Sequence, residues 1–223
     1  MAAGSRVAPR RARDPGNAAG LETRQRIVAT AERLFARHGL DAVSVRDITT
    51  AARVNTAAIN YHFGTKRGLV MAVLERRAEQ LGERRAELLD EIERDPSPTL
   101  RDVVAALVIP TAELASDRRS GGYFYVGFLA TVLDHPEYVK VVANAFDEVT
   151  NRYLVALERV TPHLPADVRE FRFAFAKDFI NRALVLPPHV HHWIEQHAPG
   201  ADEPLTDRII DFVTGAFAGP AVA

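Results

Sequence analysis

Apolar residues recur at helical spacing along most of the chain. After Leu21, the positions Ile27, Ala31, Leu34 and Phe35 follow the i, i+4, i+7, i+8 order that places them on one face of a helix. No stretch shows the convincing alternation of apolar and polar residues, bounded by turn signals, that is typical of a strand. The pattern therefore predicts an all-α protein.

Capping and turn residues divide the first part of the chain into four predicted helices. Gly39 ends the first helix, and Ser44 can cap a short second one. Asn55 can cap a short third helix and Thr65 a fourth, which continues to about Arg94. The first three helices are compact, and a tight turn joins the second to the third. This arrangement is typical of a helix-turn-helix unit.

The chain after the Asp-Pro-Ser-Pro segment of residues 95–98 is also predicted to be helical. Its predicted helices span residues 99–116, 123–133, 136–160, 166–186 and 205–217. Pro110 lies inside the first of them and predicts a kink there. Residues 187–204 are predicted to form a polar loop. It contains four histidines: His189, His191, His192 and His197.

Charge is distributed unevenly along the chain. Residues 1–70 hold 12 Lys and Arg against 5 Asp and Glu, a net +7, whereas residues 71–223 hold 16 against 24, a net −8. This asymmetry predicts two modules, of which the basic front one is suited to a polyanion. Residues 1–20 are rich in Ala, Arg, Gly and Pro without periodicity, which predicts a disordered arm.

Composition and missing motifs exclude several classes of protein. The 223 residues contain no cysteine, which removes disulfides, cysteine nucleophiles and Cys-ligated zinc. No apolar run approaches the ~18 residues of a membrane span, and the N-terminus lacks the apolar core of a secretory signal. No phosphate loop, GxSxG elbow, HExxH helix or dinucleotide fingerprint occurs. The sequence predicts a cytoplasmic protein that is not an enzyme, needs no cofactor and does not contact a membrane.

Residues 44–69, SVRDITTAARVNTAAINYHFGTKRGL, resemble the helix-turn-helix of the tetracycline-repressor (TetR) family of bacterial transcriptional regulators. The resemblance covers about residues 22–75 and is most specific at Asn60-Tyr61-His62-Phe63-Gly64, followed by Thr65-Lys66. It implies a homodimer with a DNA-binding domain at residues 21–68 and a helical ligand-binding and dimerisation domain at 69–223. By analogy, we expect a repressor that a small apolar or amphipathic effector releases from a pseudo-palindromic operator.

Two positions depart from the family's common pattern. A glycine often stands where this chain has Arg53, and an arginine in a left-handed turn costs about 1 kcal/mol. An acid often stands where this chain has Gly68, so Thr65 lacks the partner that would complete a capping box. Neither departure removes a predicted DNA contact.

The exposed face of the predicted third helix carries side chains suited to a DNA groove. Thr56 or Ala57 can place a methyl group against a thymine methyl, and Asn60 can bind adenine or a phosphate. Tyr61 and His62 are expected to hydrogen-bond backbone oxygens of the DNA, with packing between helices as the alternative.

Two cations near helix N-termini complete the predicted DNA-binding set. Lys66 stands at the start of the fourth helix and Arg46 at the start of the second, where the positive end of each helix dipole also favours a phosphate. Ile59 and Phe63, on the other side of the third helix, are assigned to the core.

The TetR resemblance implies that the last two long helices, residues 166–186 and 205–217, pair with those of a second subunit as a four-helix bundle. Both helices have wide apolar surfaces, and a terminal helix of this kind must bury two faces. A single core within one chain is the alternative. The expected interface residues are Phe171, Phe179, Ile209, Phe212, Val213 and Phe217.

Aromatic and polar residues of the second module are candidates for an effector pocket. The candidate walls are Phe124, Phe128, Val132, Phe146 and Phe175, and the candidate polar contacts are Asn181 and Arg182. Ordinary core packing is the alternative for each wall residue. The NYHFG form of the motif resembles that of family members that sense lipid-derived or acyl-CoA ligands.

Two other functions of the second module stay open. It can bind an adaptor protein, which a solid core with an exposed apolar groove would favour, whereas an enclosed pocket would favour a small molecule. The four histidines can bind zinc or nickel in a metal sensor. However, no cysteine or suitably spaced carboxylate assists them, so we expect no metal site.

Overall fold

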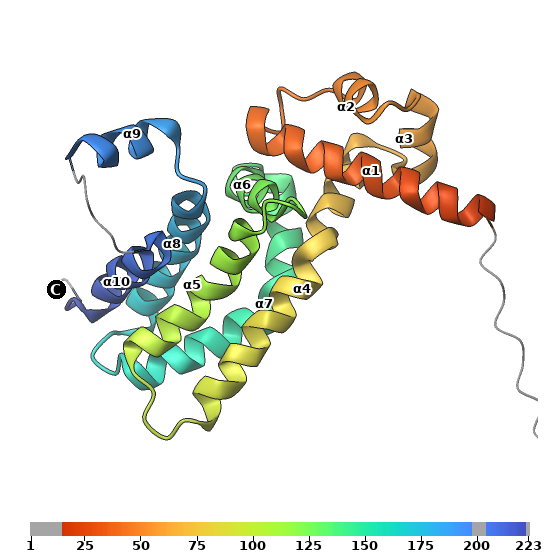
Figure 1. Cartoon of the computed structure of the whole chain (residues 1–223). Helices are drawn as coiled ribbons and strands as arrows, with labels where there is room; N and C mark the ends of the chain where they lie inside the picture. Colours follow the sequence, from red (N-terminus) through yellow and green to blue (C-terminus); the bar gives the residue numbers. More distant parts are fainter. Residues whose placement is uncertain (1–14, 198–203, 222–223) are drawn as a thin grey trace, which may run out of the picture.

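The computed structural model describes residues 15–197 and 204–221, and every regular element in these residues is an α-helix (Figure 1). The all-α prediction is confirmed for this part of the chain. The helices are α1 (Pro15–His38), α2 (Val45–Ala52), α3 (Thr56–Phe63), α4 (Lys66–Arg94), α5 (Leu100–Ser116), α6 (Gly122–Val132), α7 (Pro136–Val160), α8 (Ala166–Leu184), α9 (Pro188–His197) and α10 (Leu205–Ala218).

The short helices α2 and α3 begin at the predicted capping residues. The Ser44 hydroxyl accepts the Asp47 N–H, and the Asp47 carboxylate accepts the Ser44 N–H in return, which forms a capping box. The Asn55 side chain accepts the Ala58 N–H at 2.9 Å and caps α3. Between them, Arg53 takes the left-handed conformation with φ 54° and ψ 50°, as its place in the turn predicts. Local side-chain chemistry therefore sets the helix-turn-helix geometry.

Gly68 has a structural reason for departing from the family pattern. Thr65 caps α4 by accepting the Gly68 N–H at 3.1 Å, without a box partner. A Cβ atom added at Gly68 would collide with the backbone carbonyl of Phe63. Since a backbone atom cannot move as a side-chain tip can, a residue with a Cβ atom fits here only if the connection from α3 to α4 shifts.

One predicted helix boundary and one predicted loop are wrong. Helix α1 begins at Pro15, six positions before the predicted start, so residues 15–20 are helical and not part of a disordered arm. Residues 1–14 of that predicted arm lie outside the described residues. The predicted polar loop after α8 contains a helix, α9, which begins with Pro188 in the first turn, where proline needs no hydrogen bond to a preceding turn.

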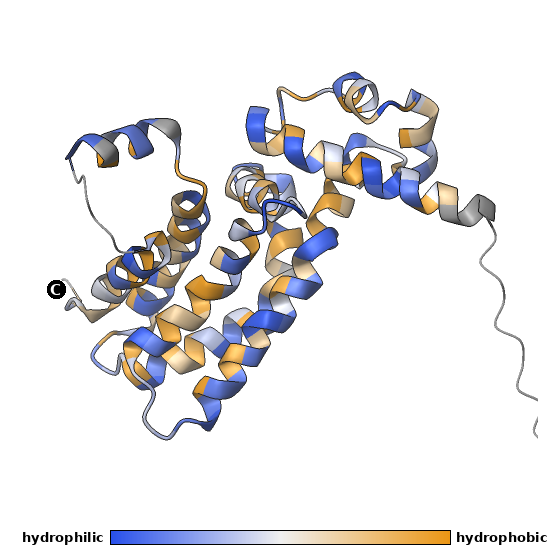
Figure 2. Cartoon of the chain, viewed as in Figure 1, coloured by the Kyte–Doolittle hydropathy of each residue, from blue (hydrophilic) through white to orange (hydrophobic). Residues whose placement is uncertain are grey.

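Two buried clusters hold the helices together. The first joins α1, α2, α3 and the start of α4 to α6, so α1 lies between the α2–α3 pair and α6 (Figure 1). The second joins the end of α4 to α5, α7, α8 and α10. Pro110 is buried inside α5, which continues through it. Figure 2 shows apolar residues on the sides that these helices turn toward one another and polar residues on the outer side of α4.

None of the helices in the described part of the chain is both long and apolar enough to cross a lipid bilayer.

Candidate DNA-binding surface and ligand cavity

Helix α3 separates its residues as the sequence predicts. Ile59 is 1% exposed and faces the core, while Thr56, Ala57 and Asn60 are all exposed on the opposite side. Tyr61 has 85% of its surface exposed, which contradicts the alternative that it packs between helices. The helix thus offers methyl groups, an amide and a phenol on one solvent-facing surface.

His62 lies at the edge of this surface. It is half-buried, and its ring contacts those of Tyr61 and Phe63, with centroids 4.9 and 5.9 Å apart. Arg24 of α1 places its guanidinium 5.3 Å from the centroid of the Phe63 ring. Sequence reasoning did not single out Arg24, because only the fold brings α1 to the end of α3.

The two predicted phosphate-binding cations differ in their surroundings. Arg46 is exposed in the first turn of α2. Lys66 is half-buried, its Nζ atom donates to the Leu40 carbonyl at 2.6 Å, and it lies 5.9 Å from the centroid of the Phe35 ring. One of the three Lys66 donors is therefore engaged in holding α4 against the turn after α1, whereas the Arg46 guanidinium is open to solvent.

A cavity of about 210 Å³ lies within the larger part of the molecule, between α4, α5, α6, α7 and α8. Most of its lining is apolar, and we call it the helical cavity. It is lined by Leu81, Arg85, Leu107, Leu129, Leu133, Val139, Val142, Ala143, Phe146, Thr150, Lys177, Ile180 and Asn181. Two predicted pocket residues, Phe146 and Asn181, are among them. A second cavity of about 170 Å³ shares Val142 and Phe146 with it and extends toward the start of α4.

Two cations line the helical cavity. Arg85 donates to the Thr111 hydroxyl at 3.2 Å, and its guanidinium lies 5.1 Å from the centroid of the Phe146 ring. Its Nε atom is fully buried and has no hydrogen-bond partner. Lys177 Nζ lies 4.7 Å from the centroid of the Phe173 ring. Burial lowers the pKa of both groups, and the neighbouring charge of Arg85 lowers the pKa of Lys177 further.

Neither cation was predicted to line a pocket, although the sequence places both on apolar sides of their helices. Arg85 stands four residues from both Leu81 and Leu89, which are buried, so it lies on the apolar side of α4. Lys177 stands in the same relation to buried Phe173 on α8. A cation on an apolar stripe is the pattern that would have identified them.

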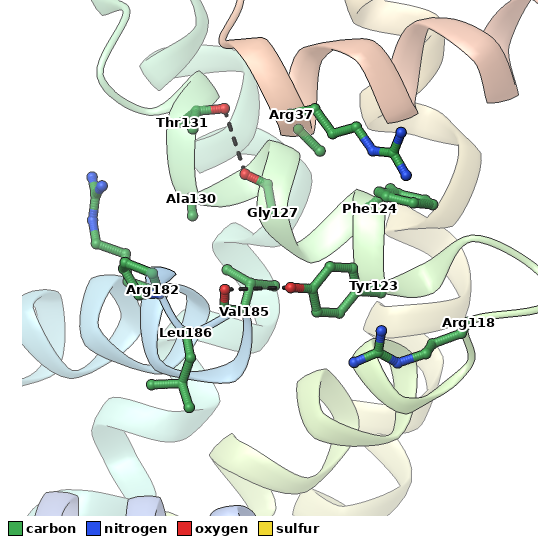
Figure 3. Close-up of a pocket in the computed structure, with 12 residues that line it drawn as sticks. Arg37, Arg118, Tyr123, Phe124, Gly127, Ala130, Thr131, Arg182, Val185 and Leu186 are labelled. Carbon is green, nitrogen blue, oxygen red and sulfur yellow. Dashed lines mark hydrogen bonds between the residues drawn. The ribbon is translucent and has the colours of Figure 1, made fainter. Parts of the chain in front are cut away.

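A larger and more open space of about 590 Å³ lies where α1 meets α6 and the end of α8. We call it the junction groove, and it includes the predicted residues Phe124 and Arg182 (Figure 3). Arg37 lies over the Phe124 ring at 5.1 Å, and the Tyr123 hydroxyl donates to the Val185 carbonyl at 3.5 Å. Arg182 is exposed and forms ion pairs with Asp134 and Asp178, so it does not serve as a polar contact within an apolar enclosure.

The remaining predicted wall residues do not line either space. Phe128 and Val132 have no exposed surface and belong to the core, where the Phe128 and Phe35 rings stack at 5.8 Å. Phe175 is wrong as a pocket wall, because it is 63% exposed on the outside of α8. Core packing, the alternative reading, therefore applies to two of the five predicted wall residues.

Two pairs of phenylalanine rings lie on the outer sides of α8 and α10, and we call them the phenylalanine face. It consists of Phe171, Phe175, Phe179 and Phe212. Phe171, Phe175 and Phe212 are 63–64% exposed. The rings of Phe171 and Phe175 are 4.6 Å apart, and those of Phe179 and Phe212 are stacked at 4.5 Å.

Half of the predicted interface residues lie elsewhere. Ile209, Val213 and Phe217 are at most 2% exposed and form part of the chain's own core, so the prediction that they contact a second subunit is wrong. They occupy the inner side of α10, whereas Phe212 occupies its outer side. The helix buries one apolar side within the chain and leaves the other open.

The four histidines lie on α9. His192 Nε2 and Gln196 Nε2 are 3.0 Å apart, and His197 Nδ1 lies 2.9 Å from the Trp193 carbonyl while its ring stacks on the Trp193 indole. Within the described residues, no three histidine, aspartate or glutamate side chains gather in a way that could hold a metal ion.

A buried ion cluster joins α1 to α4. Glu32 is 1% exposed, lies 3.2 Å from Arg76 Nη1 and 3.8 Å from Arg77 Nε, and has a pKa raised to about 7 by burial, against the lowering effect of both arginines. Arg77 also donates to the Ser120 hydroxyl at 3.1 Å. Gly121, with φ 90°, lets the chain pass the carboxylate, because a Cβ atom there would lie 3.1 Å from Glu32 Oε1.

Two family models match the chain. "Bacterial regulatory proteins, tetR family" matches residues 27–73, and "Tetracyclin repressor-like, C-terminal domain" matches residues 105–216, which is half of the chain. The chain belongs to the tetR family. Members of the tetR family are DNA-binding transcriptional regulators and not enzymes.

Individual relatives share parts of the tetR sequence or its fold. The HTH-type transcriptional regulator AcrR of Shigella flexneri is 35% identical over 83 residues, and the HTH-type transcriptional repressor NicS of Pseudomonas putida is 32% identical over 83 residues. Each match covers 37% of this chain and 39% of the relative's length. A transcriptional regulator from Saccharomonospora viridis, crystallised with choline, has the same fold, with a TM-score of 0.54 and 20% identity over 87% of this chain and 95% of that one.

Proposed function

We propose that this chain is a homodimeric, effector-responsive repressor that binds a pseudo-palindromic DNA operator. The observation that carries the proposal is the solvent-facing surface of α3, where Tyr61 is 85% exposed beside Thr56, Ala57 and Asn60. Residues 21–68, which we call the head, bind DNA, and residues 69–223 bind the effector and the second subunit. Repression agrees with the name of the relative NicS, a transcriptional repressor.

The helical cavity is the effector site in this proposal. It is lined by side chains of five helices and is mostly apolar, with few polar side chains, as small-molecule sites usually are. The presence of a cavity favours a small molecule over an adaptor protein as the signal. We assign the exposed phenylalanine face to the dimer instead of to a protein partner.

Helix α4 connects the effector site to DNA binding. It begins directly after α3, contributes Arg76 and Arg77 to the Glu32 cluster, and lines the helical cavity with Leu81 and Arg85. Because the ion cluster ties α1 to α4, a shift of α4 moves the head with it. Two recognition helices must stand about 34 Å apart to enter successive major grooves, so such a shift weakens operator binding.

The test is a titration of the purified protein onto the DNA that flanks its own gene, followed by fluorescence anisotropy between about 50 and about 200 mM salt. We expect tight binding that weakens steeply with salt, and much weaker binding to a scrambled duplex. Arg46→Ala is expected to reduce the slope of log affinity against log salt concentration by about 2, because one phosphate contact is lost in each subunit. The matched control Arg94→Ala removes another exposed arginine at the far end of α4 and leaves the slope unchanged.

Equal affinity for the flanking and scrambled duplexes would contradict operator recognition at this locus. An unchanged salt slope in Arg46→Ala would remove Arg46 from the interface.

A further inference from the structure

Arg85 and Lys177 are two positive charges that face no negative partner among residues 15–197 and 204–221. Neither forms an ion pair with a carboxylate in the described part of the chain, and no aspartate or glutamate lines the helical cavity there. Arg85 instead donates to the neutral Thr111 hydroxyl and lies over Phe146. Other arginines of this chain, such as Arg84 and Arg152, form ion pairs with two acids each.

Unpaired cations inside a protein are costly. A buried charge is normally paired or fully hydrogen-bonded, because its removal from water is otherwise strongly unfavourable. Arg85 has a fully buried Nε donor without an acceptor, and the two cations are close enough to lower the pKa of Lys177. Two like charges at one cavity wall disfavour each other until an anion lies between them.

The remaining side chains of the helical cavity favour a ligand with an apolar body. Leucine, isoleucine, valine and phenylalanine side chains make up most of the lining, and Thr150 and Asn181 are its uncharged polar members. The volume of about 210 Å³ corresponds to roughly seven water molecules at ~30 Å³ each. A molecule of roughly seven to ten non-hydrogen atoms fits this space, with further apolar room beyond Phe146.

We infer that the helical cavity takes an organic acid with an apolar body, whose carboxylate binds between Arg85 and Lys177. This inference rests on the proposed function of the cavity as the effector site and narrows the effector to one chemical class. The guanidinium of Arg85 supplies the unsatisfied Nε donor and matches a carboxylate in shape, while Lys177 adds a second charge. Cationic and neutral molecules of the same size are disfavoured.

The test compares three unbranched probes of eight carbons each: octanoate, octanol and octylamine. Isothermal titration calorimetry on the full-length protein measures binding, and anisotropy of the operator complex measures release. We expect octanoate to bind roughly ten- to hundredfold more tightly than octanol, because hydrogen bonds to charged groups contribute more than neutral ones. Octylamine is expected to show no measurable binding.

Variants then locate the carboxylate. Arg85→Met and Lys177→Met keep an unbranched apolar stem without the charge. Each is expected to lower octanoate affinity about tenfold or more while octanol affinity is kept. Arg84→Met is the matched control, because Arg84 is the neighbouring residue of α4 and pairs with Glu87 and Glu113 outside the cavity. Circular dichroism checks that each variant is folded. If one of the two cavity variants does not fold, the other still tests the assignment.

The outcomes separate this inference from the proposed function. Octanoate that binds no more tightly than octanol, or that binds Arg85→Met and Lys177→Met as tightly as the unchanged protein, overturns the organic-acid assignment. Release of the operator by octanol or octylamine, but not by octanoate, also overturns it while supporting an effector-responsive regulator. Octanoate that binds through Arg85 without releasing the operator supports the assignment and contradicts the proposed coupling.

Discussion

The phenylalanine face of α8 and α10 leads to a quantitative prediction about the proposed dimer. Phe212→Ala removes an aromatic ring that is 63% exposed in the single chain. A phenylalanine side chain buries about 200 Å² in all, so about 100 Å² of apolar surface is lost from the interface when alanine replaces it. At about 25 cal/mol per Å², this is about 2.5 kcal/mol for each copy.

Two-fold symmetry doubles this loss. In a symmetric dimer the same patch occurs on both subunits, so Phe212→Ala costs about 5 kcal/mol of association free energy. That energy corresponds to three to four orders of magnitude in the dimer dissociation constant, at about 1.4 kcal/mol per factor of ten. Phe212 also stacks on Phe179 within its own chain, so the thermal stability of the variant must be measured alongside.

Sedimentation equilibrium over a dilution series measures the dissociation constant. Val155→Ala is the control, because Val155 is also 62% exposed but belongs to α7. The control is expected to dissociate as the unchanged protein does. A Phe212→Ala dimer whose dissociation constant stays within about threefold of the original would show that α8 and α10 do not form the interface through this face.

Two further predictions concern the stability of the single chain. Gly68→Ala is expected to destabilise the fold by more than about 2 kcal/mol in urea unfolding, since its Cβ meets the Phe63 carbonyl. The control Gly82→Ala, on the same helix, has open space for its Cβ and is expected to stabilise the fold by about 0.5–1 kcal/mol. Equal effects of the two substitutions would contradict the steric argument. Burial raises the pKa of Glu32 from 4.5 to about 7, so between these pH values the folded state holds a proton that the unfolded state loses. The contribution of Glu32 to the free energy of unfolding is therefore expected to fall by roughly 3 kcal/mol as the pH rises from about 4.5 to about 7. Unfolding in urea at both ends of this range should show a weaker fall in Glu32→Gln, and an equal fall in both proteins would refute the assignment.

Local signals in the sequence were enough to predict most helix boundaries. Ser44, Asn55 and Thr65 cap the helices that they were expected to cap, because an N-cap depends on residues only three positions away. The exposed side of α3 could be predicted for the same reason, since helical spacing alone separates Ile59 from Asn60 and Tyr61. Where these signals are weak, as at the start of α1 and in α9, the predictions were wrong.

The sites in the larger domain could not be derived from spacing. Periodicity marked Phe128, Phe146 and Phe175 equally as apolar, yet one is core, one lines the cavity and one faces solvent. Likewise, α10 is apolar on two sides, and its sequence does not state which side the chain itself covers. Phe212 and Phe217 received the same assignment and have opposite surroundings.

The sequence by itself determined that this protein is helical, where its recognition helix lies and which side of that helix meets DNA in the proposed complex. These properties depend on interactions within one or two helical turns. Only the tertiary structure decided which apolar surfaces meet, where they leave a cavity, and that Arg85 and Lys177 come together at its wall from helices 92 positions apart in the chain. Packing between distant helices fixes those features, because a helix repeats its side chains in a set order but does not encode the neighbour that each one will touch.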